Sequence, residues 1–466
     1  MGAALSFVDR DYLDHQTPAR SPVIPDRGFA ERLVAEADDL QALMLLLGRH
    51  DPERQWTRKD ITALLCSMLV GLDRLLESQL DAILHHTDFQ ALEANWRGLA
   101  LLTDQVVESD NDGLVRVRLL DLSWNLVRKD LTRAIEFDHS RLFAKIYSEE
   151  FGNPGGEPFG LLLGAWTVSH RTEGGQSNIN ILRELARVGA AAFAPVIVNA
   201  DPSFFGVDRF ADLTAVSELD SHFTQPELVK WQALRKDEDA RFLGLAMPRL
   251  LLRAPHLGPG QGASSFRYRE ARNRTEQDYL WGPACFGFGA VAIRAFCQSG
   301  WFAQIRGFRA GEGAYGVVDN LPGIQGHTST GERFPSRHAV DWQITDRMER
   351  ALAEEGFLPL SPLANTEMLA FHSVPSVQRP AHHDQVSAQM SARLSAMLPY
   401  TLCVSRFAHY LKVMGRDRVG GYRTPEDCEE QLRKWLRTYT MASEGASDEM
   451  RARFPLRDAH VSVKAR

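Results

Sequence analysis

The first part of the chain places apolar residues at helical spacing. A single amphipathic helix is predicted over 29–47, where apolar residues follow one another by three or four positions. Its apolar face comprises Phe29, Leu33, Ala37, Leu40, Met44 and Leu47. Gly48 and Pro52 are expected to end this helix.

The next predicted helix carries a heptad pattern. It is expected to begin at a capping box of Thr57 and Asp60, with Trp56 and Ile61 as a hydrophobic staple. Steps of four and three then alternate along a seam of Ile61, Leu65, Met68, Leu72, Leu75, Gln79 and Ala82. A seam of about three heptads suits a helix that docks on another chain, and it also suits a long helix buried in its own domain.

The central part mixes helices with short apolar runs. A third helix is predicted from Thr87, after which Val115, Val117 and Leu119 alternate with arginines as in a half-buried strand. Helical segments are expected over 125–147. The nearly unbroken apolar run from Phe159 to Val168 predicts a strand buried on both faces.

The same alternation continues towards the C-terminus. Further strands are predicted at 195–198, 242–247 and 357–360, and further helices at 178–192, from 224, at 283–295 and at 344–355. A strand–helix–strand rhythm of this kind is typical of an α/β body. The last part is predicted to be helical over 385–414 and 425–440, and Val461 to Lys464 alternate like the start of a strand.

The fold class that follows is α/β, or mixed α+β, with a helical N-terminal region and a helical C-terminal part. We expect three domains, with an N-terminal arm and helices at 1–78, a central domain at 79–375 and a C-terminal domain at 376–466. Residues up to about Asp26, with Pro18, Pro22 and Pro25, are expected to form a flexible arm.

Composition narrows the classes of function. The formal net charge of -7 lacks the basic excess that nucleic-acid binding usually requires, so no nucleic-acid partner is expected. The five cysteines are scattered and form no C-x-x-C pair, which favours free thiols in a reducing compartment. The sequence contains neither a signal peptide nor an apolar stretch of the ~20 residues that a membrane span needs. We therefore expect a cytoplasmic protein without membrane insertion.

Motifs for chemistry are sparse. Residues Gly311 to Gly316 match G-x-G-x-x-G, but a dinucleotide site needs a helix after the last glycine, and Pro322 and Gly323 interrupt one almost at once. The His85-His86 pair is interpreted as solvated at a helix end, and His382-His383-Asp384 as a polar connector. We predict no catalytic residue, no cofactor and no metal. The alternative is an α/β enzyme that binds a phosphate-containing ligand at 311–316.

Several ordered motifs resemble the large sheath subunit of type VI secretion systems, the TssC/VipB family of Gram-negative bacteria. They run in order from about residue 80 to 458. The first ones are Phe89-Gln90-Ala91-Leu92-Glu93 with Trp96-Arg97-Gly98-Leu99, and Tyr147-Ser148-Glu149-Glu150-Phe151-Gly152 with Gly155-Gly156-Glu157-Pro158-Phe159-Gly160. Shorter ones are Leu280-Trp281-Gly282, Ile305-Arg306-Gly307 and Ile344-Thr345-Asp346-Arg347. The most distinctive block comprises Ala392-Arg393-Leu394-Ser395, Leu398-Pro399-Tyr400 and Ser405-Arg406-Phe407-Ala408-His409-Tyr410-Leu411-Lys412. Glu426-Asp427-Cys428 and Phe454-Pro455-Leu456-Arg457 follow it.

The resemblance implies a structural role with many partners. Such subunits pair with a small sheath subunit of the TssB/VipA type, and copies of the pair stack helically around an inner tube. Contraction on a baseplate drives tube and effectors out of the cell. An AAA+ unfoldase then recycles the sheath, mainly through the small subunit. A sheath-like protein of a phage tail or another contractile machine is the nearest alternative.

Candidate interface residues follow from the pattern and the resemblance together. For docking of the small subunit we predict Leu33, Leu40, Leu47, Ile61, Leu65, Met68, Leu72 and Leu75, and for strand exchange Val461 and Val463. Two features depart from the family. Ala165-Trp166 stand where an acidic residue and a tyrosine are common, and the sequence ends at Arg466, where relatives continue with a strand-forming tail. Since that tail links neighbouring subunits, we expect weaker assembly, whether the sequence is a shortened or a divergent form.

Overall fold

The computed structural model describes residues 27–153, 155–173, 176–215, 219–256, 266, 268–270, 279–308, 315–327, 333–364, 366–417, 425–441, 445 and 447–463. The chain forms two compact units. The first comprises Met1–His85 with His256–Arg272, and the second comprises His86–Pro255 with Asn273–Arg466. The predicted arm before Asp26 lies outside the described residues. The three-domain division at 78/79 and 375/376 stays a prediction.

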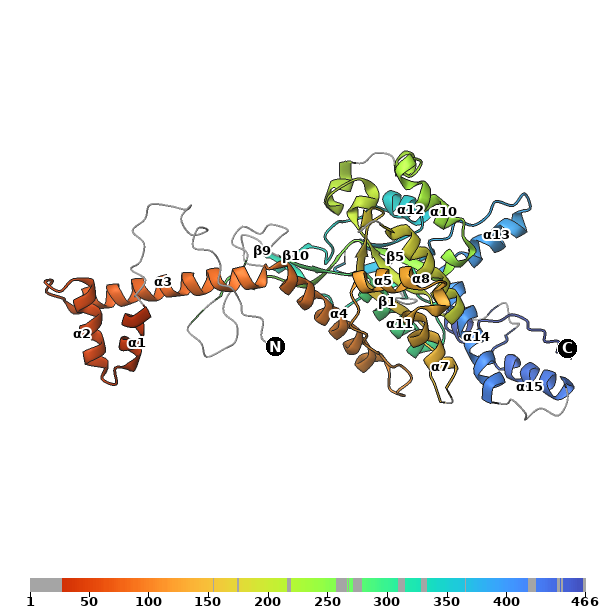
Figure 1. Ribbon diagram of the computed structural model, residues 1–466, viewed down its shortest axis with the longest axis horizontal. Coiled ribbons are helices and arrows are strands. Elements are labelled where there is room, and N and C mark those ends of the chain that lie inside the picture. Colours follow the sequence, from red (N-terminus) through yellow and green to blue (C-terminus); the bar gives the residue numbers. More distant parts are fainter. Residues whose placement is uncertain are drawn as a thin grey trace. The chain divides into compact units, whose positions relative to one another are not determined.

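The first unit contains the helices α1 (Arg27–Ala35), α2 (Asp39–His50) and α3 (Arg58–Leu84) (Figure 1). The prediction of one helix over 29–47 is wrong, because residues 36–38 interrupt it. The Asp38 carboxylate accepts the backbone N–H of Leu40 at 3.1 Å and caps α2. A short acidic side chain that bonds nearby backbone N–H groups favours the start of a new helix over the continuation of an old one.

The start of α3 is confirmed. The Thr57 hydroxyl accepts the N–H of Asp60 at 3.3 Å, and the Asp60 carboxylate accepts the N–H of Thr57 at 3.1 Å, which completes the capping box. The hydrogen bonds with Thr57 keep the pKa of Asp60 below its usual value. The Arg54 guanidinium, 3.0 Å from the Asp60 carboxylate, adds to this effect. From this start α3 continues for 27 residues.

Residues of the later segment of the first unit, His256–Arg272, contact the end of α3. Glu270 is buried, and its carboxylate lies 3.0 Å from His85 Nε2 and accepts the N–H of His256 at 3.1 Å. The Tyr268 hydroxyl bonds Asp81 at 2.6 Å. The interpretation of His85 as half of a solvated pair is therefore wrong, because the buried Glu270 needs a polar partner. His86 is exposed.

The second unit is built around a six-stranded sheet with the order β1-β4-β5-β11-β12-β8. Four neighbours are parallel: β1 (Leu162–Val168), β4 (Val196–Ala200), β5 (Leu243–Met247) and β11 (Phe357–Pro362). The antiparallel strands β12 (Leu369–Phe371) and β8 (Val317–Val318) follow. The strands predicted at 195–198, 242–247 and 357–360 are confirmed, and the mixed α/β class with them.

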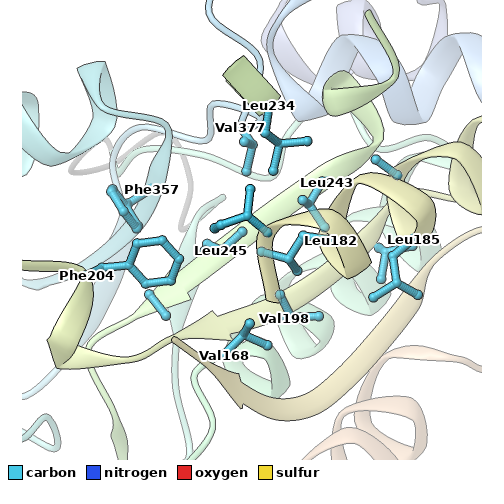
Figure 2. Packing of buried hydrophobic residues seen from close by; sticks show 14 of the residues in the cluster. Val168, Leu182, Leu185, Val198, Phe204, Leu234, Leu243, Leu245, Phe357 and Val377 are labelled. Atoms are coloured by element: carbon cyan, nitrogen blue, oxygen red, sulfur yellow. The ribbon is translucent and has the colours of Figure 1, made fainter. Parts of the chain in front are cut away.

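Alternate residues of these strands pack into two separate hydrophobic cores. Val196 and Val198 of β4 face one core, and Ile197 between them faces the other, as the period of two in a strand requires. The first core is covered by α8 (Asn178–Ala192), α10 (Val229–Arg235) and α12 (Asp346–Glu354). Figure 2 shows Leu182 and Leu185 of α8 over this face. The second core is covered by α4 (Thr87–Ser109) and α11 (Cys285–Ser299).

Two expectations for strands are wrong. The Val115–Leu119 stretch is described without a strand, and β1 is only half-buried along Leu162, Leu163, Ala165 and Trp166. β1 is only half-buried because it lies at the edge of the sheet. Among the described residues it pairs with β4 alone, and the covering helices bury the central strands more completely than an edge.

Short helical turns link α4 to β1. These are α5 (Trp124–Arg133), η2 (Phe137–His139), α6 (Arg141–Phe143), η3 (Ala144–Ser148), which is π-helical, and α7 (Glu149–Phe151). The remaining connections contain α9 (Leu219–Phe223), η4 (Pro202–Phe205), η5 (Phe210–Ala215), η6 (Pro226–Leu228) and η7 (Glu238–Phe242). The described residues also form two-stranded pairs: β2 (Thr172–Glu173) with β3 (Gln176–Ser177), β6 (Leu250–Arg253) with β7 (Leu280–Gly282), and β9 (Ile324–His327) with β10 (Arg333–Arg337).

The C-terminal part is helical as predicted. It contains α13 (Val386–Ser395), α14 (Leu398–Asp417), α15 (Pro425–Arg437) and α16 (Asp448–Arg453). The helix expected over 385–414 is divided at 396–397, where the Ala396 carbonyl accepts the Ser376 N–H at 2.9 Å. The start of a strand expected at Val461 does not form in the single chain, where residues 461–463 are described without a strand.

Candidate protein-interaction surfaces

The predicted interface residues of the first unit lie on all three helices. Leu33 on α1 and Leu47 on α2 are half-buried, whereas Leu40 on α2 is exposed. On α3, Ile61, Met68 and Leu75 are half-buried, and Leu65 and Leu72 are exposed. The heptad seam of α3 is therefore only partly available to a partner.

A neighbouring stripe of α3 is more exposed than the predicted seam. Leu69, Leu76 and Ile83 are 59%, 51% and 52% exposed. They recur every seven residues and lie beside Leu65 and Leu72, whereas the buried Leu64 and Gly71 lie on the other side of the seam. We call Leu65, Leu69, Leu72, Leu76 and Ile83 the α3 stripe. Leu69, Leu76 and Ile83 were not among the residues predicted from the sequence, although their spacing of seven is itself a heptad signal.

The two C-terminal candidates are engaged within their own chain. Val461 and Val463 are half-buried, and the Val463 N–H is donated to the Glu429 carboxylate of α15 at 3.2 Å. Among the described residues, neither valine is part of a strand. Their role in strand exchange stays a prediction.

A small hollow lies at the carboxyl ends of β1, β4 and β5, where open α/β sheets bind ligands. Its volume of about 230 Å³ is below the ~300 Å³ at which ligand pockets begin. Asn199 on its wall is fixed, since its amide donates to the Gly164 and Trp166 carbonyls at 3.1 Å each. Cys285 nearby is fully buried, and burial raises the pKa of its thiol to about 12.

A larger hollow of about 690 Å³ lies between α5 and α8. Its charged wall residues include Glu184 and Arg187, which form an ion pair at 2.9 Å, and Lys230. Burial raises the pKa of Asp239, which also lines it. The arrangement offers paired charges rather than an exposed nucleophile beside a base.

Two motifs were considered as ligand or metal sites in the sequence. Where the structure describes them, they form connecting segments. Gly311 to Ala314 lie outside the described residues. Gly316 is fixed by a backbone hydrogen bond, in which its N–H donates to the Gly307 carbonyl at 2.8 Å. β8 follows directly at Val317. A strand there does not provide the helix N-terminus that a dinucleotide fingerprint needs. His382-His383-Asp384 form an exposed connector, as predicted.

Two further observations concern metals and membranes. Within the described stretches, no three His, Cys, Asp or Glu side chains come together as ligands of a metal ion. Among the same residues, none of the helices combines the length and apolarity needed to span a bilayer.

Comparison with known proteins gives two consecutive family matches. Residues 67–378 match the VipB model, described as the EvpB/VC_A0108 tail sheath N-terminal domain. Residues 387–466 match the VipB_2 model, described as the EvpB/VC_A0108 tail sheath gpW/gp25-like domain. The type VI secretion system sheath protein TssC1 of Pseudomonas aeruginosa is similar, with 34% identity over 402 residues that cover 85% of this chain and 78% of the relative.

Proposed function

Because this chain belongs to the VipB family of type VI secretion sheath proteins, we propose that it is the large structural subunit of a contractile sheath. It pairs with a small sheath subunit, and the pairs polymerise helically around an inner tube in the cytoplasm. Contraction against a baseplate expels the tube with its effectors. An AAA+ unfoldase recycles the contracted sheath, mainly through the small subunit. The observation that carries this proposal is the match of two successive sheath domains along the chain.

The exposed apolar surface of the first unit supports the pairing. Most of the side chains along α3 are exposed to solvent in the single chain. The α3 stripe presents five aliphatic residues at heptad spacing. Solvent exposure of such a stripe is unfavourable, and burial against a helix of a partner removes the cost. Repeated contacts between unlike surfaces then generate an open helical polymer.

Non-enzymatic action is part of the same proposal. The hollow at the sheet's carboxyl edge is small, and the thiol beside it is buried and protonated. Nucleotides and dinucleotides at millimolar concentration are expected to leave the melting temperature unchanged. A clear rise would instead favour the alternative of an enzyme with a phosphate ligand.

Co-expression with the small sheath subunit tests the proposal directly. We expect the two chains to purify together and to appear as tubes or as stable pairs in electron micrographs. A soluble monomer that is indifferent to the small subunit would contradict the proposal.

Substitutions in the α3 stripe locate the contact. Leu69→Glu with Leu76→Glu removes two aliphatic contacts worth ~1.5–3 kcal/mol each, so affinity for the small subunit should fall by roughly 100-fold or more. Val70→Glu is the matched control, because Val70 is also exposed on α3 but lies away from the stripe. Equal binding by the double variant and the control would remove the stripe from the interface.

A further inference from the structure

Two of the motifs that resemble the sheath family meet in the second unit. The motif that begins at Tyr147 spans the end of η3 and α7, and the motif that ends at Lys412 lies on α14. The Lys412 ammonium donates a hydrogen bond to the Tyr147 hydroxyl at 3.1 Å. Since these two residues are 265 positions apart in the sequence, no local pattern predicts the contact.

Aromatic rings of three residues surround the Lys412 ammonium. Its nitrogen lies 4.8, 5.1 and 4.6 Å from the ring centres of Tyr147, Phe151 and Phe193. A cation within ~6 Å of the centre of an aromatic ring is attracted by the negative face of that ring. We call Lys412 and these three aromatic residues the Lys412 cage. The side chain of Lys412 is exposed to solvent at its outer side, so its positive charge, rather than apolar burial, holds it there.

Local irregularities of the backbone place two of the three rings. Tyr147 lies in the π-helical turn η3, and π-helical turns frequently occur at functional sites. Phe193 follows α8 with a left-handed backbone, at a φ of 52°. A bulky residue is rarely found in this conformation, which persists only where the surrounding structure enforces it. The cage is therefore built from backbone conformations that an ordinary helix would not adopt.

The two halves of α14 are attached to the rest of the unit in different ways. In the first half, Leu398 and Leu402 are buried in the second core. In the second half, residues 411–416 are all exposed or half-buried. Besides Lys412, Arg416 contacts the body there, since its guanidinium donates to the Asn153 carbonyl at 3.1 Å. The second half therefore depends on cationic side chains, whereas the first half is anchored by apolar burial.

We propose that the Lys412 cage is a clamp that fixes the second half of α14 on the body of the chain. The three rings belong to the match with the tail sheath N-terminal domain, and α14 belongs to the match with the gpW/gp25-like domain. The clamp thus joins the two sheath domains through the charge of one ammonium group. Loss of that charge frees the second half of α14, while the buried first half stays in place.

Amide hydrogen exchange of a Lys412→Met variant of the isolated chain tests the role of the charge. Methionine retains an unbranched apolar side chain and removes the cation. The amides of residues 411–416 should exchange about 3- to 30-fold faster, which corresponds to the loss of a cation–π contact. Exchange in residues 402–405 and in β4 should stay unchanged, because only the second half of α14 opens. Lys412→Arg retains a cation that stacks on aromatic rings, so this variant should exchange as the wild type.

Lys230→Met is the matched control, because Lys230 is an exposed lysine of α10 outside the cage. It should leave exchange along α14 unchanged. Wild-type exchange in Lys412→Met contradicts the clamp, and so does faster exchange of residues 411–416 in Lys412→Arg. An equal increase in residues 411–416 and in β4 would show a general loss of stability, which also contradicts it. Because the isolated chain is measured, none of these outcomes depends on pairing with the small sheath subunit.

Substitutions of Tyr147 separate the effect of its ring from that of its hydroxyl group. Tyr147→Phe removes the hydrogen bond and keeps the ring, so exchange of residues 411–416 should rise less than in Lys412→Met. Tyr147→Leu removes the ring as well and should raise exchange further. Combined with Lys412→Met, Tyr147→Leu should add little, because both changes remove the same contact. Fully additive effects of these two substitutions would show that the residues act independently, and would overturn the inference.

Discussion

Arg235 and His409 are buried polar residues of the second unit, and they differ in the interactions that offset the free-energy cost of their burial. Arg235 is 2% exposed, and its guanidinium bonds the Glu355 carboxylate at 2.5 Å. Burial lowers the pKa of Arg235, and the charge of Glu355 opposes that shift. For His409, no carboxylate partner is found in the part of the chain that the structure describes. Its Nε2 lies 3.0 Å from the Ala192 carbonyl, and burial lowers its pKa to about 4.

Removal of the partner of Arg235 should be costly. Glu355→Ala leaves a buried guanidinium without its counter-charge, and a loss of about 3 kcal/mol in the free energy of unfolding is expected. Glu354→Ala changes the same residue type one position earlier, where the side chain is exposed, and should cost less than ~0.5 kcal/mol. Urea unfolding of the two variants measures the difference, and similar values would show that the ion pair is unimportant.

The neutral His409 should make stability depend on pH. The unfolded chain takes up a proton here below its ordinary pKa of 6.5, whereas the folded chain does so only near pH 4. The free energy of unfolding therefore falls as pH drops from about 6.5 to 4, by about 3 kcal/mol from this residue. His409→Gln should lose less stability than the wild type over that range, and His383→Gln, in the exposed connector, should behave as wild type. Parallel pH profiles for all three would contradict the assignment.

At the scale of elements, small residues decide how closely two helices pack. Gly98 of α4 lies against Phe286 of α11 so closely that a Cβ on Gly98 would stand 2.2 Å from the ring. Gly289 of α11 is similarly close to Leu163 and Leu102. The tightly packed helix predicted at 283–295 is confirmed by α11, and its glycines allow α4 to cover the sheet.

Gly98→Ala should therefore destabilise the protein although alanine favours helices. Overpacking against the buried ring should outweigh the propensity gain of about 1 kcal/mol, with a net loss of roughly 1–2 kcal/mol. Gly48→Ala on α2 is the matched control, because no atom lies within 4 Å of its added Cβ, and it should be neutral or stabilising. Thermal unfolding compares the two, and a stabilised Gly98→Ala would contradict this packing.

At the scale of the whole molecule, the two units have very different interiors. Within the residues that the structure describes, the first unit buries few large apolar side chains, among them Phe29, Leu46 and Leu64. The second has two extensive cores on the faces of one sheet. Since stability follows the apolar surface that is buried, the first unit has less of its own apolar burial to stabilise it.

This contrast predicts unequal hydrogen exchange in the isolated chain. Amides of α3 should exchange by local opening well before those of β4 and β5, which lie in the middle of the sheet. Binding of the small subunit should slow exchange in α3 and leave β4 and β5 nearly unchanged. Equal protection of α3 and the central strands in the free chain would contradict this division.

The local pattern of the sequence was sufficient for features that depend on neighbours along the chain. The capping box at Thr57 and Asp60, the strands at 195–198, 242–247 and 357–360, and the ordered sheath motifs were all predicted, because caps and periodicities act within a few residues. The sheath family was recognised for the same reason. None of these depends on a distant segment.

Tertiary structure decided which of these surfaces remain free. Periodicity predicted an apolar seam on α3, but not that Leu69, Leu76 and Ile83 would be its most exposed neighbours. The apolar run before Val168 predicted a covered strand, yet the sheet order made β1 an edge. Alternation at Val115–Leu119 predicted a strand, yet the stretch is described without one. Periodicity shows which residues share a face, whereas the partner of that face is set by contacts between segments far apart in sequence or on another chain.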